Sequence, residues 1–412
     1  MRGRIKDKVA IIGVGCTKFG ELWEKDMEDL LVEASYEAFE DAGIEPRDVD
    51  AIWCGVFYYF TGLAGTAAAE PLKLYGKPVT RVENYCASGM DAFRNACFAV
   101  ASGAYDIVMA CGVEKIMDSG TRGLPGLTDF GHPFYGQVSA PGMFAMAATR
   151  CFHKYGWTKE DLALVAVKNH YNGAAHPKAH FRREIKVEDV LKAPMIAWPL
   201  GRYDCCAMSD GAAALILTRP EIAKQYKHKD DYVLVKANGL AVETVYPFYK
   251  PSFDYLGFPA TRKAAEEAYR EAGIENPRKE ISFAEVHDCF TITEILNYED
   301  LGFCKKGEGA DFIREGISSI EGDLPVNPSG GLKCFGHPIG ATGCRMLYEV
   351  TKQLQGRADG RQVEDPRART GTQPWRTCKC GVSHNTRKEH NTTFFFHFLR
   401  NINREGKLQL FN

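Results

Sequence analysis

Asn84-Tyr85-Cys86-Ala87-Ser88-Gly89-Met90 lies between a β-rich lead-in, residues 79–82, and an amphipathic run, residues 91–100. This order predicts a strand, a tight turn with Cys86 at its tip, and then a helix. A helix N-terminus offers unpaired N–H groups and a positive dipole end, so the Cys86 thiol is expected to be biased toward the nucleophilic thiolate. The pattern predicts covalent catalysis on an electrophilic carbonyl. The alternative is a buried structural cysteine.

Two further segments carry histidines. Gly336-His337-Pro338-Ile339-Gly340-Ala341-Thr342-Gly343 combines flexible glycines with a His-Pro turn that presents an imidazole, and it opens another predicted helix. Without the Lys-Ser/Thr pair of a P-loop, its glycines are only a weak signal for phosphate binding. His287-Asp288-Cys289-Phe290 follows an apolar stretch and adds a second histidine and another cysteine.

Taken together, these motifs resemble the nucleophile loop and the two His-bearing loops of thiolases. The His-Asp-Cys-Phe form is similar to that of the sterol-carrier-protein and archaeal types. Gly112-Val113-Glu114-Lys115 and Ser209-Asp210-Gly211-Ala212-Ala213-Ala214 also match, and the resemblance covers roughly residues 8–370.

The chain also repeats a pattern of its own. Residues 38–53 and residues 268–286 each read as a helix, a glycine, a Pro-bearing turn and a strand. The duplication and the resemblance imply an α/β thiolase fold of two halves, packed as five layers, α-β-α-β-α, with an inserted loop domain. A pseudo-twofold axis between the halves would bring the helix ends of Cys86 and His337 to one pocket.

We expect four segments along the chain. The N-terminal half comprises residues 1–116 and 201–231, the loop domain residues 117–200, and the C-terminal half residues 232–371. Residues 372–412 form an aberrant tail, where the family would have a loop such as His-Asn-Leu-Gly-Gly. If the codons from Gly371 onward are read one base later, they permit Ala-His-Asn-Leu-Gly-Gly-Pro-Ala-Ser-Val. A one-base frameshift near residue 370 is therefore our hypothesis.

Composition narrows the class of protein. The 412 residues are enough for two or three cores, and the formal net charge of −2 argues against nucleic acid as a partner. No apolar run has the length of a membrane span. The 14 cysteines show neither a disulfide framework nor a four-ligand zinc set, so we expect no metal and reduced thiols in the cytoplasm.

The resemblance implies an acyltransferase that cleaves a 3-oxoacyl-CoA with CoA, or runs the reverse condensation. Cys86 would carry the acyl group and His337 would activate it as a base. His287 and His337 would polarise the enolate oxygen, and backbone N–H groups, including that of Cys86, would hold the oxyanion. Cys289 would be the second acid/base. Core packing is the alternative for Cys289, and Cys334 is a rival for the role.

Coenzyme A would be a substrate, and no cofactor is expected. In thiolases the inserted loop domain covers the acyl-CoA. Lys178, Arg182 and Arg183 are therefore candidates for the CoA phosphates, with Ser329 and Gly330 as further CoA contacts. A solvated basic loop is the alternative for each of the three cations.

The sequence does not identify the acyl group of the substrate. Aromatic clusters around residues 57–60, 130–135 and 246–255 suit a bulky or aromatic acyl group, with a dimer interface or a loop-domain core as the alternative. The resemblance extends to thiolases that cleave benzoylsuccinyl-CoA to benzoyl-CoA and succinyl-CoA in anaerobic toluene degradation. Acetoacetyl-CoA or medium-chain thiolases, related condensing synthases and a non-catalytic acyl-binding subunit are the alternatives.

The same branch of the family implies partners. A homodimer core is expected, because thiolases pair through their first halves. A small subunit with an OB fold and a zinc ribbon is expected to complete the acyl site, and any metal would belong to that subunit.

Overall fold

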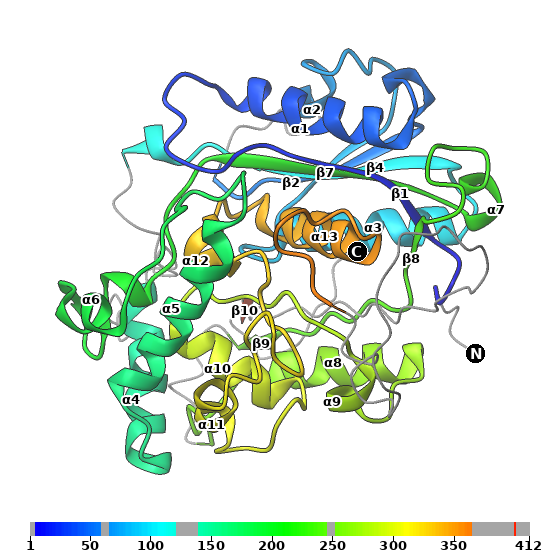
Figure 1. Cartoon of the computed structure of the whole chain (residues 1–412). Coiled ribbons are helices and arrows are strands. Elements are labelled where there is room, and N and C mark those ends of the chain that lie inside the picture. Colours follow the sequence, from blue (N-terminus) through cyan, green and yellow to red (C-terminus); the bar gives the residue numbers. More distant parts are fainter. Residues whose placement is uncertain (1–4, 59–65, 121–138, 245–251, 365–398, 401–412) are drawn as a thin grey trace, which may run out of the picture.

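The computed structural model describes residues 5–58, 66–120, 139–244, 252–364 and 399–400. A six-stranded mixed sheet with the order β3-β2-β4-β7-β1-β8 forms the frame of the first half (Figure 1). Its strands are β1 (Ala10–Cys16), β2 (Ala51–Gly55), β3 (Val79–Val82), β4 (Ile107–Glu114), β7 (Gly211–Thr218) and β8 (Val233–Leu234). The pairs β2–β3 and β2–β4 are parallel, and the other pairs are antiparallel.

Helices cover both faces of this sheet. The long strands β1, β4 and β7 are buried along their whole length, as is typical of strands with helices on either side. Helix α1 (Met27–Ala42) packs on one face, while α3 (Ser88–Ala101) and α13 (Thr342–Leu354) pack on the other (Figure 1). Successive residues of a strand therefore enter separate cores. In β1, Ile12 packs in the core on the α1 face, and Ile11 packs in the core on the face covered by α3 and α13.

The internal repeat is visible in the helices. Helix α1 ends at Gly43 (φ 72°), and its counterpart α8 (Pro259–Ala272) ends at Gly273 (φ 82°). Both glycines adopt the left-handed conformation that terminates a helix without a Cβ clash. A short turn follows each of them, η1 (Pro46–Asp48) and α9 (Pro277–Glu280).

The strands of the second half differ from the prediction. Residues 232–237 form only the short β8, which joins the first sheet through β1, and residues 281–286 make a single bridge between Ala284 and Val326. In the described part of the chain, extended segments occupy the layer between α3/α13 and the pair α8 and α10 (Thr291–Asp300), where a second sheet was expected (Figure 1). A strand is assigned only where it has a hydrogen-bonded neighbour, and residues 365–398 of the second half and the tail lie outside the described residues.

Helices α3 and α13 lie side by side at the centre of the molecule. A Cβ on Gly89 would lie 2.4 Å from the carbonyl oxygen of Gly340, and one on Gly343 would lie 2.3 Å from the backbone nitrogen of Met90. The two helix starts can approach this closely only because both positions lack a side chain. The expected meeting of the two helix ends is confirmed by this packing.

The insert after β4 consists mainly of helices. Helix α5 (Lys159–Ala174) packs on α10 (Thr291–Asp300) and α12 (Gly331–Phe335), so the insert contacts the second half directly. The other elements of the insert are η2 (Met117–Ser119), α4 (Ala140–Tyr155), α6 (Val187–Lys192), β5 (Met195–Ala197) and β6 (Leu200–Gly201). Elsewhere lie α2 (Thr66–Ala69), η3 (Arg202–Asp204), α7 (Pro220–Ala223) and α11 (Gly309–Arg314).

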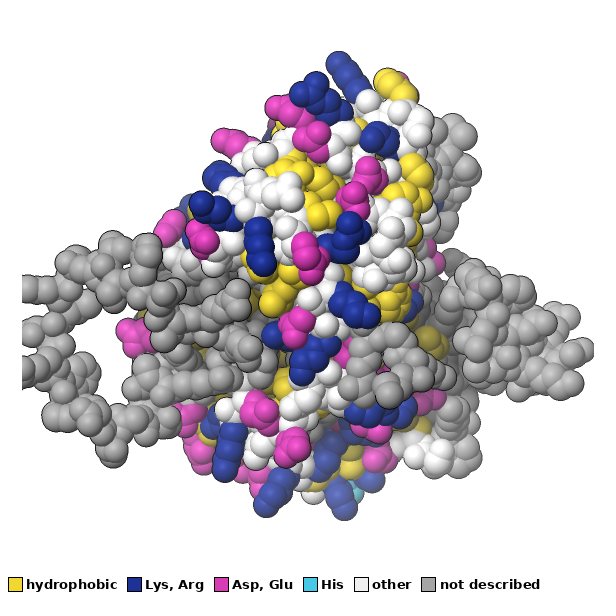
Figure 2. Space-filling model, turned by 90° about the vertical axis from the view of Figure 1, so that its right-hand side faces the viewer, with side chains coloured by type: hydrophobic (Ala, Val, Ile, Leu, Met, Phe, Trp, Pro, Cys, Tyr) yellow, Lys and Arg dark blue, Asp and Glu magenta, His cyan; other side chains and the backbone are white. Residues whose placement is uncertain are grey.

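Most of the aberrant tail lies outside the described residues, as do residues 59–60, 130–135 and 246–251 of the aromatic clusters. From the tail, β10 (Leu399–Arg400) pairs in parallel with β9 (Glu243–Thr244). Among the described residues, no helix is long and apolar enough to cross a membrane. On the face shown in Figure 2, acidic and basic side chains are interspersed, in keeping with the formal net charge of −2.

Candidate active site

The turn that carries Cys86 is fixed by its own backbone and by Ser88. Tyr85 adopts a positive φ of 51°, and the Ser88 hydroxyl donates to the Tyr85 carbonyl (2.6 Å) while it accepts from the Asn84 N–H (2.8 Å). These bonds hold the chain in a tight reversal between β3 and α3. The predicted order of strand, turn and helix is confirmed, and Cys86 lies two residues before the first residue of α3.

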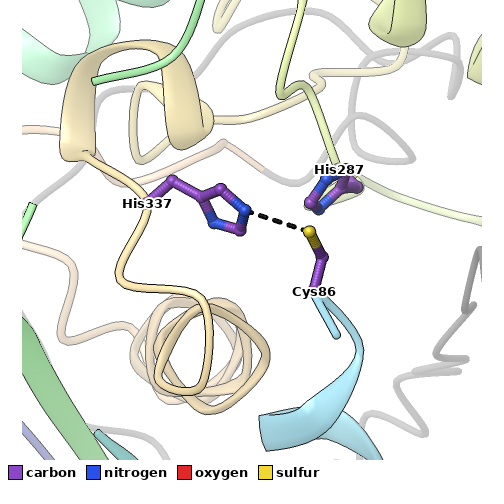
Figure 3. Close-up of side chains that lie close together, drawn as sticks. All are labelled: Cys86, His287 and His337. Carbon is purple, nitrogen blue, oxygen red and sulfur yellow. Dashed lines mark hydrogen bonds between the residues drawn. The ribbon is translucent and has the colours of Figure 1, made fainter. Parts of the chain in front are cut away.

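His337 comes to the same point from the second half. Its Nε2 lies 3.3 Å from Cys86 Sγ, and its Nδ1 lies 2.7 Å from the Thr342 hydroxyl oxygen (Figure 3). The single hydroxyl proton of Thr342 is directed to the Pro338 carbonyl (2.9 Å), so the hydroxyl accepts the proton of Nδ1. We therefore assign the tautomer with a bare Nε2, which can accept the thiol proton of Cys86.

His287 completes a three-residue cluster. One ligand-type atom from each of Cys86, His287 and His337 lies within 4.8 Å of the other two, and both imidazoles point toward the sulfur (Figure 3). The two rings are 5.2 Å apart and nearly perpendicular. Side chains of these types can also bind a transition metal. A metal here would occupy the sulfur lone pair that a nucleophile needs, so we assign the cluster to acyl transfer.

Burial sets the protonation states of the cluster. It raises the pKa of the Cys86 thiol, with a further increase from the Cys206 thiol, and it lowers the pKa of His337, as does the neighbouring His287. Both shifts favour a neutral thiol beside a neutral imidazole. Desolvation therefore opposes the bias toward thiolate that the helix N-terminus was expected to give. His337 must take the proton as the reaction proceeds.

The two candidates for the second acid/base face different ways. Cys289 is buried, and the nearby Cys86 thiol adds to the rise that burial causes in its pKa. Its sulfur lies 3.7 Å from the Thr293 hydroxyl. Cys334 instead directs its thiol to the Phe181 carbonyl (2.6 Å), in the insert. The geometry thus favours Cys289 over Cys334.

We expect Cys289→Ser to abolish the exchange of acyl-CoA α-protons with solvent deuterium, because a serine hydroxyl is a far weaker acid than a thiol. Acyl transfer to Cys86 should survive in this variant. Proton NMR of an acyl-CoA in deuterated buffer measures the exchange, and Cys334→Ser is the matched control. Exchange at the wild-type rate in Cys289→Ser would assign the proton transfer to Cys334 or to water.

A buried polar network supports the His287-Asp288-Cys289 loop. The Asp288 carboxylate accepts from the Leu332 and Lys333 N–H groups at the start of α12 (2.6 and 3.1 Å). Asn169 of α5 donates to Asp288 (2.9 Å) and to Glu294 (2.7 Å). Burial, followed by repulsion from Glu294, raises the pKa of Asp288 to about 7. The insert therefore helps to position the catalytic loop, which the sequence motifs did not indicate.

Glu114 connects the loop after β2 to the loop of His337. Its buried carboxylate accepts from the N–H groups of Phe57 (3.1 Å), Tyr58 (2.8 Å) and Gly340 (2.9 Å). Burial raises the pKa of Glu114 to about 7. The sequence motif that contains Glu114 did not predict this role. The backbone groups that Glu114 binds come together only in the folded chain.

The residues suggested for CoA lie in three kinds of environment. Arg182 and Arg183 are exposed on the insert. The ammonium group of Lys178 already pairs with Glu37 and binds the Cys16 carbonyl. Ser329 and Gly330 are buried. The Ser329 hydroxyl binds Glu285 (2.8 Å) and Arg345 (2.7 Å), while Gly330 packs closely on α5.

An α/β fold that joins one cysteine and two histidines at two central helix ends defines a cysteine-dependent acyltransferase. The chain belongs to the thiolase family. The family model described as the thiolase N-terminal domain matches residues 9–221, and the thiolase C-terminal domain-like model matches residues 250–372. The predicted thiolase fold is confirmed, and the chain is an acyltransferase enzyme that acts on CoA thioesters.

The relatives differ in the reactions that their names state. The chain is 43% identical to the acetyl-CoA acetyltransferase of Methanothermobacter thermautotrophicus, over 86% of this chain and 93% of that protein. It is 34% identical to the benzoylsuccinyl-CoA thiolase subunit BbsB of Thauera aromatica, over 88% and 92%. It also resembles a solved chain of the Ltp2-ChsH2(DUF35) aldolase, with a TM-score of 0.76, 28% identity and coverage of 88% and 93%.

Proposed function

We propose that the chain cleaves a 3-oxoacyl-CoA with CoA through an acyl-enzyme on Cys86. The 3.3 Å approach of His337 Nε2 to Cys86 Sγ carries this proposal. Cys86 sulfur attacks the 3-oxo carbon while its proton passes to Nε2. The bond between C2 and C3 then breaks, and the Cys289 thiol protonates C2 of the departing acyl-CoA. His287 and protonated His337 donate to the enolate oxygen in this step.

The second half-reaction restores the groups. Free CoA enters, and the Cys289 thiolate takes the proton of its thiol. The CoA sulfur attacks the acyl thioester on Cys86, and the Cys86 sulfur leaves with the proton that His337 held. At the end of the cycle Cys86 and Cys289 are again protonated thiols, and His337 is again neutral. The raised pKa of Cys289 fits this cycle, because it keeps the thiol protonated until the enolate forms.

Two candidate substrates follow from different observations. The higher identity to an acetyl-CoA acetyltransferase favours acetoacetyl-CoA. The similarity to a benzoylsuccinyl-CoA thiolase subunit favours (S)-2-benzoylsuccinyl-CoA, with a place in the degradation of aromatic compounds. A non-catalytic acyl-binding role is disfavoured by the paired Cys86 and His337. We assign the exposed Arg182 and Arg183 to the CoA phosphates, and we place the enzyme in the cytoplasm.

We also propose two kinds of partner. Strand β3 is the first strand of the sheet, and among the described residues its outer edge has no neighbouring strand, which leaves it available to a second copy of the chain. The similar Ltp2 chain was solved together with ChsH2(DUF35), which supports a small subunit of OB-fold and zinc-ribbon type. The assembly would be a homodimer that carries two such subunits.

Co-expression of the chain with the small subunit allows the proposed function and the proposed partner to be tested together. We expect CoA-dependent cleavage of a 3-oxoacyl-CoA, measured by loss of its enolate absorbance, with a several-fold higher rate when the small subunit is present. Native mass spectrometry should show two copies of each chain. A dimer that is fully active and neither binds nor responds to the small protein would remove the partner. Absence of cleavage under both conditions would remove the catalytic proposal.

The tail provides an independent test. The thiolase family models do not extend beyond residue 372, close to the proposed frameshift near residue 370. We expect a chain with the His-Asn-Leu-Gly-Gly frame restored to be about tenfold or more faster, because that loop would add an oxyanion N–H to the pocket. The same cleavage assay on both chains measures the change. Equal rates would show that the tail as written supports full activity.

A further inference from the structure

Lys333 is a buried cation that the acyl-transfer steps do not use. Its side chain is 2% exposed, and it lies four residues before His337 in α12. Among the described residues, no carboxylate lies within 4.0 Å of its ammonium group, since no ion pair includes Lys333. A buried ammonium group without a counter-ion is costly, so it is rarely retained without a role.

An acidic side chain in the surroundings of Lys333 is already engaged. Asp204 lies within electrostatic range of Lys333, but its carboxylate pairs with Lys159 and accepts from the Gly201 N–H (2.7 Å) and the Thr291 hydroxyl (2.9 Å). Desolvation by burial lowers the pKa of Lys333, while Cys334, Cys206, Cys205 and Asp204 oppose that shift. An anion from outside the protein would offset the desolvation of the ammonium group.

A second cation lies beside the same aromatic ring as Lys333. The Lys333 ammonium nitrogen lies 5.8 Å from the centre of the Tyr203 ring, and the Arg183 guanidinium carbon lies 5.9 Å from the same centre. Arg183 is exposed and donates to the Tyr203 hydroxyl (2.7 Å). An exposed cation, Arg183, and a buried cation, Lys333, thus both lie near the Tyr203 ring. The two cations make the surroundings of this ring electrostatically positive, which favours an anionic group.

Lys333 also lies beside the catalytic loop, residues 287–289. The Cys206 N–H donates to the Cys289 carbonyl (2.9 Å), and the Cys206 thiol lies within electrostatic range of both Cys86 and the Lys333 ammonium group. The Lys333 N–H donates to Asp288 (3.1 Å), between His287 and Cys289. Because both segments contact the catalytic loop, we expect a group bound at Lys333 to belong to the part of the substrate near the reacting carbons.

We propose that Lys333 binds a carboxylate on the acyl part of the substrate, so that the site selects 3-oxoacyl-CoA thioesters with an acidic acyl group. The inference rests on the proposed function and names its substrate class. Of the two candidate substrates, 2-benzoylsuccinyl-CoA retains a free carboxylate and acetoacetyl-CoA has none. Pairing with a charged group in a desolvated site gives strong discrimination, because a neutral analogue leaves the cation unpaired.

Equilibrium binding separates this inference from catalysis. Glutaryl-CoA and pentanoyl-CoA have acyl chains of the same length, and only glutaryl-CoA carries a carboxylate; neither has the 3-oxo group that cleavage requires. By isothermal titration calorimetry on the whole chain, we expect glutaryl-CoA to bind about 100-fold more tightly. Lys333→Met, of similar length and neutral, should remove most of that preference. Lys192→Met, on the exposed face of α6, is the matched control and should keep it.

The outcomes distinguish the possibilities. Equal affinities in the wild-type chain would overturn the inference, whether or not the variant folds. Equal weakening of glutaryl-CoA, pentanoyl-CoA and free CoA in Lys333→Met would also overturn it, since Lys333 would then serve the CoA moiety. A retained preference for glutaryl-CoA in a folded Lys333→Met variant would assign the carboxylate to another residue. Failure of the proposed function would show separately, as the absence of acyl transfer to Cys86.

Discussion

Cys86→Ala is expected to reduce 3-oxoacyl-CoA cleavage by at least about 10⁴-fold, the loss typical of a removed covalent nucleophile. The reason is structural, because Cys86 Sγ is the one atom of the cluster that can carry an acyl group while His337 takes its proton. The affinity for CoA should remain near the wild-type value, since the thiol contributes little to binding of the nucleotide. Steady-state kinetics and calorimetry with CoA measure the two effects.

Cys304→Ala is the matched control for this prediction. Cys304 is partly exposed after α10, in surroundings formed by Glu299, Glu308 and Lys306. We expect this variant to retain wild-type activity. Cleavage by Cys86→Ala within tenfold of the wild-type rate would show that another group carries the acyl chain, provided that thermal unfolding shows the variant to be folded.

His337→Ala is expected to slow acylation by about 10²–10⁴-fold, the contribution typical of a general base. It should also slow the alkylation of Cys86 by iodoacetamide at neutral pH, because burial raises the pKa of the thiol and leaves it dependent on Nε2. The alkylation rate of the wild-type chain should increase with pH from 6 to 9, since a raised thiol pKa means that thiolate accumulates only at high pH. A thiolate–imidazolium pair would instead give a flat profile in that range.

His287→Ala separates the two imidazoles. We expect it to slow turnover and to spare alkylation, because its role is to donate to the enolate oxygen rather than to accept the thiol proton. His153→Ala, on the exposed last turn of α4, should change neither rate. If His287→Ala and His337→Ala slow alkylation equally, the assignment of His337 as the sole base is wrong.

The sequence was sufficient to predict the parts of the fold that local chemistry controls. Gly43 and Gly273 marked two equivalent helix ends, and the motif around Cys86 indicated a turn between a strand and a helix. The meeting of Cys86 with His337 was expected from the duplication, because a pseudo-twofold axis would bring the two helix starts together, and the 3.3 Å contact agrees with that expectation. Of the strands expected in the second half, the described residues show β8 and the bridge between Ala284 and Val326, because a strand is assigned only where a hydrogen-bonded neighbour is described.

The site was predictable in its residue types but not in its electrostatics. A cysteine before a helix suggested a thiolate, yet desolvation depends on how much chain surrounds the sulfur, and no motif shows that. Thr342 sets the tautomer of His337. It belongs to the motif of residues 336–343, but the sequence did not indicate this role. Asn169 lies in a helix of the insert that carries no motif, and only packing brings it to Asp288.

The most direct test of acyl transfer through Cys86 is the position of the acyl group during the reaction. The chain is mixed with a 3-oxoacyl-CoA in the absence of free CoA and quenched in acid, and its peptides are analysed by mass spectrometry. We expect a single acyl thioester on Cys86, which free CoA removes when it is added before the quench. An acyl adduct on Cys289, Cys334 or any other residue, with Cys86 unmodified, would contradict the account.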